Sequence, residues 1–312
     1  MKFLIIAALC LAFTSTSYGQ QSVSLSMIVT DNDNKGVNTI RKDQVRVIED
    51  KIDQAILSIE PDERPVDLVI ALDSSGSFRT LMPAALESAR LMVVNRRPDD
   101  RIAIVRFVSR SIIEKMQEFT ADGDTLLKAI DQFYVEKGQS AVIDALYISA
   151  QYVAEHNNSN DNRRRVVAII TDGEDRSSYY KEEQLLKLLR EQGVQVFILG
   201  VVYELEADAR FARPGSRAKA EKLLTHVAEE SGGRVLFPKD KTALVESTAQ
   251  VIYDLRAQFR IKYQSTNTDT KPGFRKVDVK FVSTDSEKRK LLAPPGYYFG
   301  PRPPATKPEK KP

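Results

Sequence analysis

The sequence predicts an α/β fold, in which a doubly wound, mostly parallel sheet has helices on both faces. The first observation is an apolar run from Val66 to Leu72, interrupted only by Asp67, which is typical of a strand buried on both faces. The second is that strand and helix patterns alternate after this run, joined by short connections. The third is alternation at period two on either side of this region, which predicts further strands outside the sheet.

The pattern places six strands in this sheet. After the run at 66–72, the others are expected at 101–108, 110–118, 166–171, 194–202 and 234–237. The strand at 110–118 follows its predecessor so closely that it should run antiparallel to it. Apolar residues at helical spacing predict helices at 79–96, 124–134, 141–153, 181–192, 218–231 and 242–258.

Two short segments with strand patterns flank the α/β region, at 22–60 and 259–299. Neither is long enough to hold a stable core alone, so we expect them to pack together as one β-sandwich-like module. The α/β domain would then be inserted between the strands of this module. The expected limits are 20–63 for the N-terminal β segment, 64–257 for the α/β domain, 258–300 for the C-terminal β segment and 301–312 for a disordered, Pro- and Lys-rich tail.

Residues 1–19 are expected to be a secretory signal peptide. A positive start at Met1-Lys2 precedes an apolar core from Phe3 to Phe13, and Ser17 and Gly19 place small residues at the −3 and −1 positions. A membrane anchor is the alternative, but this core is well short of the ~20 residues that a spanning helix needs. Cleavage after Gly19 would give a protein that is secreted or held in the periplasm or cell envelope.

Composition excludes several other classes. The net charge is +3 and charges of both signs are mixed along the chain, so nothing indicates a nucleic-acid partner. The only cysteine, Cys10, lies inside the predicted signal, so the mature chain would hold neither a disulfide nor a thiolate metal site. Outside the signal, no stretch is long and apolar enough to span a bilayer.

Oxygen-bearing side chains occur at three separated points beside the predicted strands. Asp73, Ser75 and Ser77 directly follow the first strand, Ser140 lies on a loop before a helix, and Asp172 follows the strand at 166–171. Open α/β sheets bind ligands at the carboxyl ends of their strands. Two carboxylates and three hydroxyls suit Mg²⁺ or Mn²⁺, whereas the absence of Cys and of a nearby His disfavours zinc. Hydroxyls are neutral ligands, so the cation would remain electrophilic and could accept an incoming carboxylate.

Parts of this pattern have simpler interpretations when they are taken alone. Asp73 or Ser77 could cap the helix that follows. Glu174 and Asp175 add negative charge near Asp172, and we interpret them as solvated loop or helix-capping residues and not as ligands. The metal site is favoured because all three elements occur together.

The combination resembles the von Willebrand factor A (VWA) domain and its metal-ion-dependent adhesion site (MIDAS). The matching motifs are D-x-S-G-S from Asp73 to Ser77, G-x-S-A around Ser140 and T-D-G around Asp172. The resemblance spans about residues 64–257. It implies a six-stranded doubly wound sheet, a Mg²⁺ ion at these residues and a protein partner that presents an Asp or Glu. The family usually has Thr where this chain has Ser140, which keeps the hydroxyl but lacks the methyl group that stiffens χ1.

The flanking segments resemble those of exported bacterial VWFA-related domain proteins. The matching positions are Thr30-Asp31, Val37, Asp43, Val47 and Glu49-Asp50 before the domain, and Leu255–Phe259 and Pro295–Tyr298 after it. The resemblance therefore implies an exported, metal-dependent adhesion or interaction module.

Two alternative functions remain open beside this one. In a metal-assisted hydrolase the ion would activate water, but no His, Lys or Cys is placed near these strand ends to act as a general base. No dinucleotide or P-loop fingerprint follows any strand. The other alternative is a metal-free structural scaffold of the cell envelope.

Overall fold

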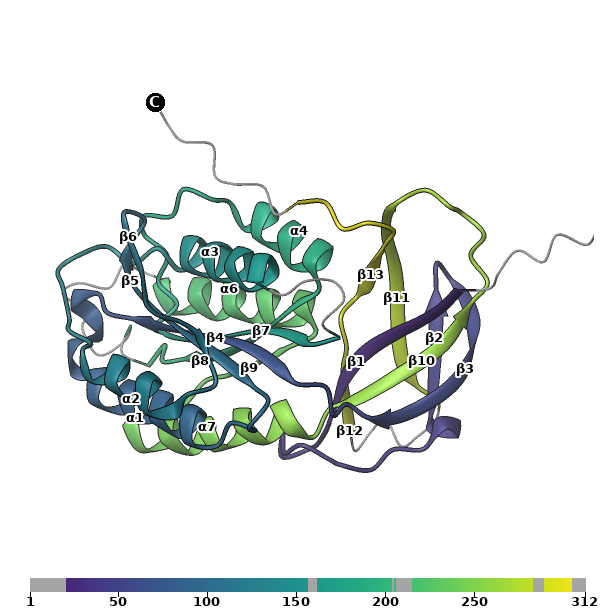
Figure 1. The fold of residues 1–312 in the computed structure, drawn as a ribbon, viewed down its shortest axis with the longest axis horizontal. Helices are drawn as coiled ribbons and strands as arrows, with labels where there is room; N and C mark the ends of the chain where they lie inside the picture. Colours follow the sequence, from purple (N-terminus) through teal and green to yellow (C-terminus); the bar gives the residue numbers. More distant parts are fainter. Residues whose placement is uncertain (1–20, 157–161, 204, 206–214, 283–288, 305–312) are drawn as a thin grey trace, which may run out of the picture.

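The computed structural model describes residues 21–156, 162–203, 205, 215–282 and 289–304 (Figure 1). The expected signal peptide and residues 305–312 of the expected tail lie outside the described residues. Two units lie side by side: an α/β domain, and a module of antiparallel strands to its right in the view of Figure 1. Within the described residues, none of the helices combines the length and the apolar character that crossing a membrane requires.

The α/β domain is built on a six-stranded sheet in the order β6-β5-β4-β7-β8-β9. All neighbouring strands pair in parallel except β5 and β6, which are antiparallel. This confirms the predicted sheet. It also confirms that the strand predicted at 110–118, now β6, runs antiparallel to the strand before it. The strands are β4 (Val66–Asp73), β5 (Arg101–Ser109), β6 (Ile112–Thr120), β7 (Arg164–Thr171), β8 (Val194–Gly200) and β9 (Arg234–Leu236).

The central strands β4 and β7 are buried along their whole length, because helices cover both faces of the sheet. Side chains alternate along β4, so Val69 and Ala71 belong to the core on one face and Ile70 and Leu72 to the core on the other. The first core is covered by α3 (Val142–His156), α4 (Glu182–Gln192) and α6 (Ser216–Ser231). The second is covered by α1 (Met82–Val94), α2 (Gly123–Asp131) and α7 (Lys241–Arg256).

The helix predicted at 79–96 differs from the structure at its start. Residues Gly76–Thr80 form a short 3₁₀ turn, η2, and α1 begins only at Met82. Pro83 lies in the first turn of α1, where its missing N–H is not needed by the helix. The apolar spacing therefore identified the helix but not the turn that precedes it.

The two flanking segments form one curled antiparallel sheet in the order β12-β1-β10-β3-β2-β11-β13. Its strands are β1 (Gln21–Asp31), β2 (Val45–Glu49) and β3 (Ile52–Pro61), with the 3₁₀ turn η1 (Lys42–Gln44), and β10 (Phe259–Ser265), β11 (Gly273–Phe281), β12 (Arg289–Leu292) and β13 (Gly296–Phe299). The C-terminal β10 lies between the N-terminal β1 and β3, and β11 pairs with β2. Both segments contribute to one core, as predicted for a module made from both termini.

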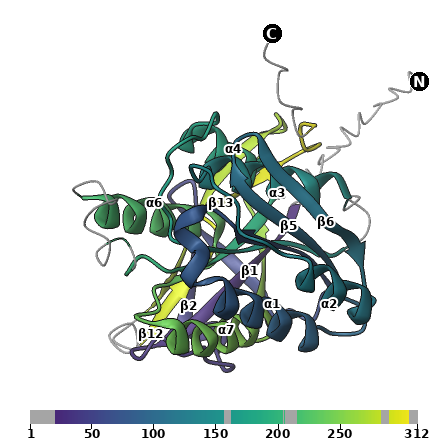
Figure 2. The same cartoon turned by 90° about the vertical axis from the view of Figure 1, so that its left-hand side faces the viewer.

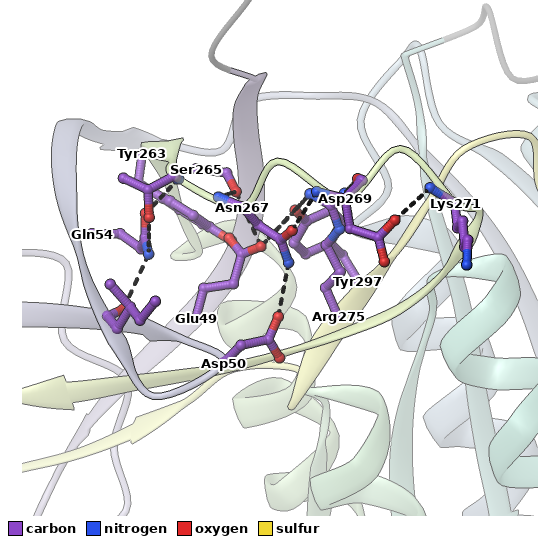
Figure 3. Close-up of polar contacts among 12 residues, drawn as sticks. Glu49, Asp50, Gln54, Tyr263, Ser265, Asn267, Asp269, Lys271, Arg275 and Tyr297 are labelled. Carbon is purple, nitrogen blue, oxygen red and sulfur yellow. Dashed lines mark hydrogen bonds and ion pairs between the residues drawn. The ribbon is translucent and has the colours of Figure 1, made fainter. Parts of the chain in front are cut away.

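A buried carboxylate joins the two segments inside this β module (Figure 3). Glu49, on β2, is 1% exposed and accepts hydrogen bonds from the Tyr263 hydroxyl (2.9 Å) and from Ser265 Oγ (3.0 Å), both on β10. The Tyr297 hydroxyl, on β13, donates a third (3.2 Å), and Arg275 Nη1 lies 3.8 Å from Glu49 Oε1. One N-terminal side chain therefore organises the polar groups of three C-terminal strands.

We expect Glu49→Ala to lower the free energy of unfolding by about 3 kcal/mol, because it leaves three hydroxyls, two of them buried, without their acceptor and Arg275 without its counter-charge. Urea denaturation followed by circular dichroism measures the change. Glu63→Ala, which removes an exposed carboxylate from the connection between β3 and β4, is the control and should stay within about 0.5 kcal/mol of wild type. Equal stabilities of the two variants would contradict the structural role of Glu49.

Candidate metal centre

The five side chains singled out in the sequence meet at the carboxyl ends of β4 and β7. This edge lies at the end of the α/β domain that is remote from the β module, and Figure 2 looks onto it. The residues that meet there are Asp73, Ser75, Ser77, Ser140 and Asp172. Parallel neighbours end at the same edge, so residues about 100 positions apart in the chain come into contact.

The loop after β4 is shaped by the Asp73 carboxylate. The backbone N–H of Ser75 donates to Asp73 Oδ1 (3.0 Å), which turns the chain back at the end of the strand. The hydroxyl oxygens of Ser75 and Ser77 are 3.1 Å apart. The N-cap of α1 is Leu81 and receives no side-chain hydrogen bond, so neither Asp73 nor Ser77 has the capping role that was their simpler interpretation.

Hydroxyl groups link the three loops. Ser140 Oγ donates to Asp73 Oδ2 (3.0 Å), and Ser77 Oγ donates to Asp172 Oδ2 (2.8 Å). Thr171 Oγ1 also donates to Asp73 Oδ2 (2.8 Å). Sequence reasoning did not select Thr171, although it belongs to the T-D-G motif. The signal that identifies it is strand register: Leu72 pairs with Ile170, which brings the next residues of β4 and β7 side by side.

The loop that carries Ser140 is held on two sides. Its Glu136 donates its backbone N–H to Ser74 O (2.9 Å) and its carboxylate pairs with Arg106 on β5 (2.8 Å). On the other side, the backbone N–H groups of Arg176 (2.9 Å) and Ser177 (3.2 Å) donate to Ser140 O. The position of the Ser140 hydroxyl is therefore fixed by contacts with both of the other loops.

The two acidic residues after Asp172 are bonded into the protein. Glu174 is 9% exposed and accepts hydrogen bonds from Arg176 Nη2 (2.5 Å) and Ser216 Oγ (3.1 Å). Asp175 accepts from Ser178 Oγ (2.5 Å) and from the backbone N–H of Ile143 (3.3 Å), in the first turn of α3. The capping interpretation fits Asp175, whereas Glu174 is buried and not a solvated loop residue.

The site holds two buried carboxylates whose negative charges are only partly compensated by their surroundings. Asp73 is fully buried and Asp172 is 2% exposed. Burial raises the pKa of Asp73, and burial together with repulsion from Asp73 raises the pKa of Asp172 to about 7. Arg176 forms its ion pair with Glu174 (2.5 Å) and adds a weaker attraction for Asp172. The hydroxyls compensate the carboxylates only partly, so the site has a deficit of positive charge.

This donor set fits a hard divalent cation. It offers oxygen atoms only, and its two carboxylates are accompanied by neutral hydroxyls, which suits Mg²⁺ or Mn²⁺. Within the described residues, no group of three or more His, Cys, Asp and Glu side chains is arranged to hold a metal, so an ion at this place would depend on the hydroxyl donors. Of the two histidines, His226 contacts Glu182 and His156 stacks on Phe119.

Comparisons with known proteins support the same family. The family model for the von Willebrand factor type A domain matches residues 67–250. Comparison with curated proteins gave no match. Domains of this family generally mediate protein–protein interactions and metal-dependent binding, and are generally interaction modules and not enzymes.

Three solved structures illustrate the similarity. An aerotolerance-related membrane protein from Bacteroides fragilis shares 18% identity over 60% of this chain and 98% of its own, with a TM-score of 0.42. BatB from Bacteroides thetaiotaomicron shares 17% identity over 61% of this chain and 98% of its own, with a TM-score of 0.44. Proximal thread matrix protein 1 from the mussel byssus, with a zinc-occupied MIDAS motif, shares 15% identity over 62% of this chain and 48% of its own, with a TM-score of 0.49. Because the family model covers more than half of its residues, this chain belongs to the von Willebrand factor type A domain family.

Proposed function

We propose that this chain is an exported, metal-dependent adhesion or interaction module that binds a carboxylate of a protein partner through a Mg²⁺ ion. The ligands of the ion, or of Mn²⁺ in its place, would be Asp73, Ser75, Ser77, Ser140 and Asp172. The observation that carries the proposal is the meeting of these oxygen donors around two buried carboxylates, whose charge is compensated by hydroxyl groups and only in part by the attraction of Arg176. The bound ion would supply the missing positive charge and a coordination position for an Asp or Glu of the partner.

The residues of the chain have distinct tasks in this proposal. Asp73 and Asp172 supply the negative charge that attracts the ion. The three hydroxyls add neutral donors, which leave the ion electrophilic toward an external carboxylate. Thr171 holds Asp73 Oδ2 from the β7 side and is a positioning residue.

The rim of the site favours an acidic partner. Arg79, on η2, and Lys137, on the loop before Ser140, are both exposed basic residues. Such charges steer an acidic surface toward the site and raise the rate of association. The aromatic side chain of Tyr179, on the loop after Asp172, is 42% exposed and offers a contact surface beside them.

Affinity capture tests this function. The mature chain, immobilised as bait, is incubated with envelope extract in Mg²⁺ or in EDTA, beside the variant Asp73→Ala. Captured proteins should be retained in Mg²⁺ and lost both in EDTA and with the variant. Asp53→Ala removes an exposed carboxylate of the β module and should capture as wild type does. Capture that is the same in all conditions would refute the metal-dependent mechanism.

The hydroxyl at position 140 offers a graded test. Ser140→Ala removes both a proposed ligand and the hydrogen bond to Asp73, so Mg²⁺ binding measured by isothermal titration calorimetry should weaken by about tenfold. Ser140→Thr keeps the hydroxyl and restricts its rotation, so its affinity should equal or exceed that of wild type. Equal affinities of the alanine variant and wild type would exclude the hydroxyl from the site.

A further inference from the structure

A single arginine interrupts the apolar run of β5. Arg106 lies between Val105 and Phe107, and its side chain is fully buried. β5 is a neighbour of β4 in the sheet, and Asp73 pairs with Phe107, so the end of β5 reaches the edge that carries the proposed metal site (Figure 2). A buried charge is costly unless the surrounding groups bind it fully. The contacts of Arg106 therefore show which part of the structure depends on it.

All three side-chain nitrogens of Arg106 have partners. Nη1 donates to Glu114 Oε2, on β6 (2.8 Å), and Nη2 donates to Glu136 Oε2 (2.8 Å). Nε donates to Tyr134 O (3.2 Å), and the guanidinium carbon lies 3.9 Å from the centre of the Tyr134 ring. Tyr134 and Glu136 belong to the connection between α2 and α3, residues 132–141, which we name the α2–α3 loop and which contains neither helix nor strand. One side chain thus ties this loop to β5 and β6.

The α2–α3 loop is held against β5 at two further points. The backbone N–H of Glu136 donates to Ser74 O (2.9 Å), and Ser74 donates its own N–H to Phe107 O (2.8 Å). Gly138 passes so close to Val108 that an added Cβ would lie 2.5 Å from Val108 Cγ1. The carboxyl end of β5 therefore supports both the loop after β4 and the α2–α3 loop.

We propose that Arg106 is a positioning residue of the metal site, which places the Ser140 hydroxyl by fixing the α2–α3 loop on β5. This inference rests on the proposed function. Ser140, whose Oγ donates to Asp73 Oδ2 (3.0 Å), follows Glu136 closely in the loop, so a displacement of Glu136 would be transmitted to it. The planar guanidinium binds two carboxylates and a carbonyl at once, which an ammonium group cannot do in the same geometry. Residues that orient metal ligands change metal affinity by roughly 10- to 100-fold when they are replaced.

The two glutamates offer a matched pair of variants. Glu114 and Glu136 each contact Arg106 at 2.8 Å, and their side chains are 49% and 41% exposed. Glu114 lies on β6, whereas Glu136 lies in the loop that carries Ser140. Glu136→Gln should weaken Mg²⁺ binding in isothermal titration calorimetry by about fivefold, and Glu114→Gln should change it by less than about twofold. Each variant loses one ion pair of similar exposure, so their melting temperatures should be alike.

Substitution of Arg106 itself should have a larger effect. Arg106→Met keeps much of the buried stem but releases both carboxylates, so the affinity for Mg²⁺ should fall by about tenfold or more. Arg106→Lys keeps the charge and should restore part of the affinity. In the metal-free protein, hydrogen exchange of the Glu136 amide should be faster in Arg106→Met and Glu136→Gln than in Glu114→Gln, because this amide donates to Ser74 O.

Failure of this inference is distinguishable from failure of the proposed function. If wild type binds no Mg²⁺, the proposed function fails, and exchange of the Glu136 amide alone decides whether Arg106 holds the loop. If wild type binds Mg²⁺ but Glu136→Gln and Glu114→Gln weaken binding equally, or Arg106→Met binds as tightly as wild type, Arg106 is not a positioning residue of the site. The two glutamine variants decide the question even if Arg106→Met does not fold.

Discussion

Replacing Asp172 with Asn should weaken Mg²⁺ binding by about 100-fold or more and abolish the rise in melting temperature that Mg²⁺ causes in wild type. The substitution keeps the shape of the side chain but removes one of the two negative charges that would hold the ion. The remaining carboxylate, Asp73, already accepts hydrogen bonds from Ser75, Ser140 and Thr171. Asp172 accepts two hydrogen bonds, from Ser77 Oγ and from the backbone N–H of Glu174, so its charge is less compensated than that of Asp73 and more available to a cation.

The same substitution has an opposite effect on the metal-free protein. Burial and repulsion from Asp73 raise the pKa of Asp172 from 3.8 to about 7, so the ionised carboxyl is disfavoured in the folded state. A group with a raised acidic pKa loses stability as pH rises from its unfolded to its folded pKa. Metal-free Asp172→Asn should thus be more stable than metal-free wild type at pH 8, and the difference should disappear toward pH 4.

Protons and Mg²⁺ compete for the same carboxylate, so the Mg²⁺ affinity of wild type should be lower at pH 6 than at pH 8. Scanning calorimetry with and without Mg²⁺ at both pH values measures all of these effects. Asp175→Asn is the matched control: its carboxyl is close in sequence but is bound to Ser178 and to α3. An Asp172→Asn protein that Mg²⁺ still stabilises as much as wild type would remove Asp172 from the proposed site.

The sequence was most informative where burial is uniform. Val66–Leu72 and the run ending at Thr171 are continuously apolar because both faces of β4 and β7 are covered, and this is why the two strands were found with nearly correct limits. Asp73, Ser75, Ser77 and Asp172 could be singled out because they follow strand ends in the local sequence, whereas Ser140 precedes α3 and was chosen because its loop completes the set of three motifs. That β4 and β7 are neighbours, although β5 and β6 lie between them in the chain, is a property of the topology. The apolar pattern of the sequence does not reveal that β4 and β7 are neighbours, whereas the resemblance to the VWA fold implied it.

Features that depend on how distant surfaces meet were not predictable in this way. The alternation in β10 predicts a half-buried strand but not its position between β1 and β3. Arg164 and Arg165 follow a polar loop and, in the sequence, are indistinguishable from solvated charges. Their burial arises from distant contacts, since Arg164 donates to Leu255 O at the end of α7 and Arg165 donates to Gln192 O at the end of α4. For the same reason, Glu49 was matched to a motif of the flanking segments, while its buried contacts with Tyr263 and Tyr297 became evident only in the structure.

Arg234→Met should lower the free energy of unfolding at pH 8 by about 3–5 kcal/mol, the cost of leaving a buried charge without its partner. Arg234, on β9, is 5% exposed and forms an ion pair with Asp254, on α7, which is fully buried. A second nitrogen of Arg234 donates to Asn34 O, in the turn after β1, so one side chain connects the α/β domain to the β module. After the substitution, Gln250 Nε2 (2.8 Å) would remain as a donor to Asp254.

The loss of stability caused by Arg234→Met should be smaller at low pH than at high pH. Burial already raises the pKa of Asp254 to about 6, because it outweighs the attraction of Arg234. Without Arg234 this pKa rises further, so at pH 5 the carboxyl is protonated in the folded state and the penalty is smaller than at pH 8. Urea denaturation at the two pH values measures the difference.

A second substitution separates the unpaired charge from the lost packing. Arg234→Met combined with Asp254→Asn removes the charge that the single variant leaves unpaired, so the double variant should recover more than half of the lost stability at pH 8. Arg90→Met, which breaks an exposed pair with Asp131, should change stability by less than about 1 kcal/mol. If the double variant is no more stable than the single one, the cost lies in the lost contact with Asn34 and not in Asp254. Hydrogen exchange of the Asn34 turn would then increase in both variants alike. If the unpaired charge of Asp254 dominates the loss of stability, the single variant should instead show faster exchange across β9 and α7.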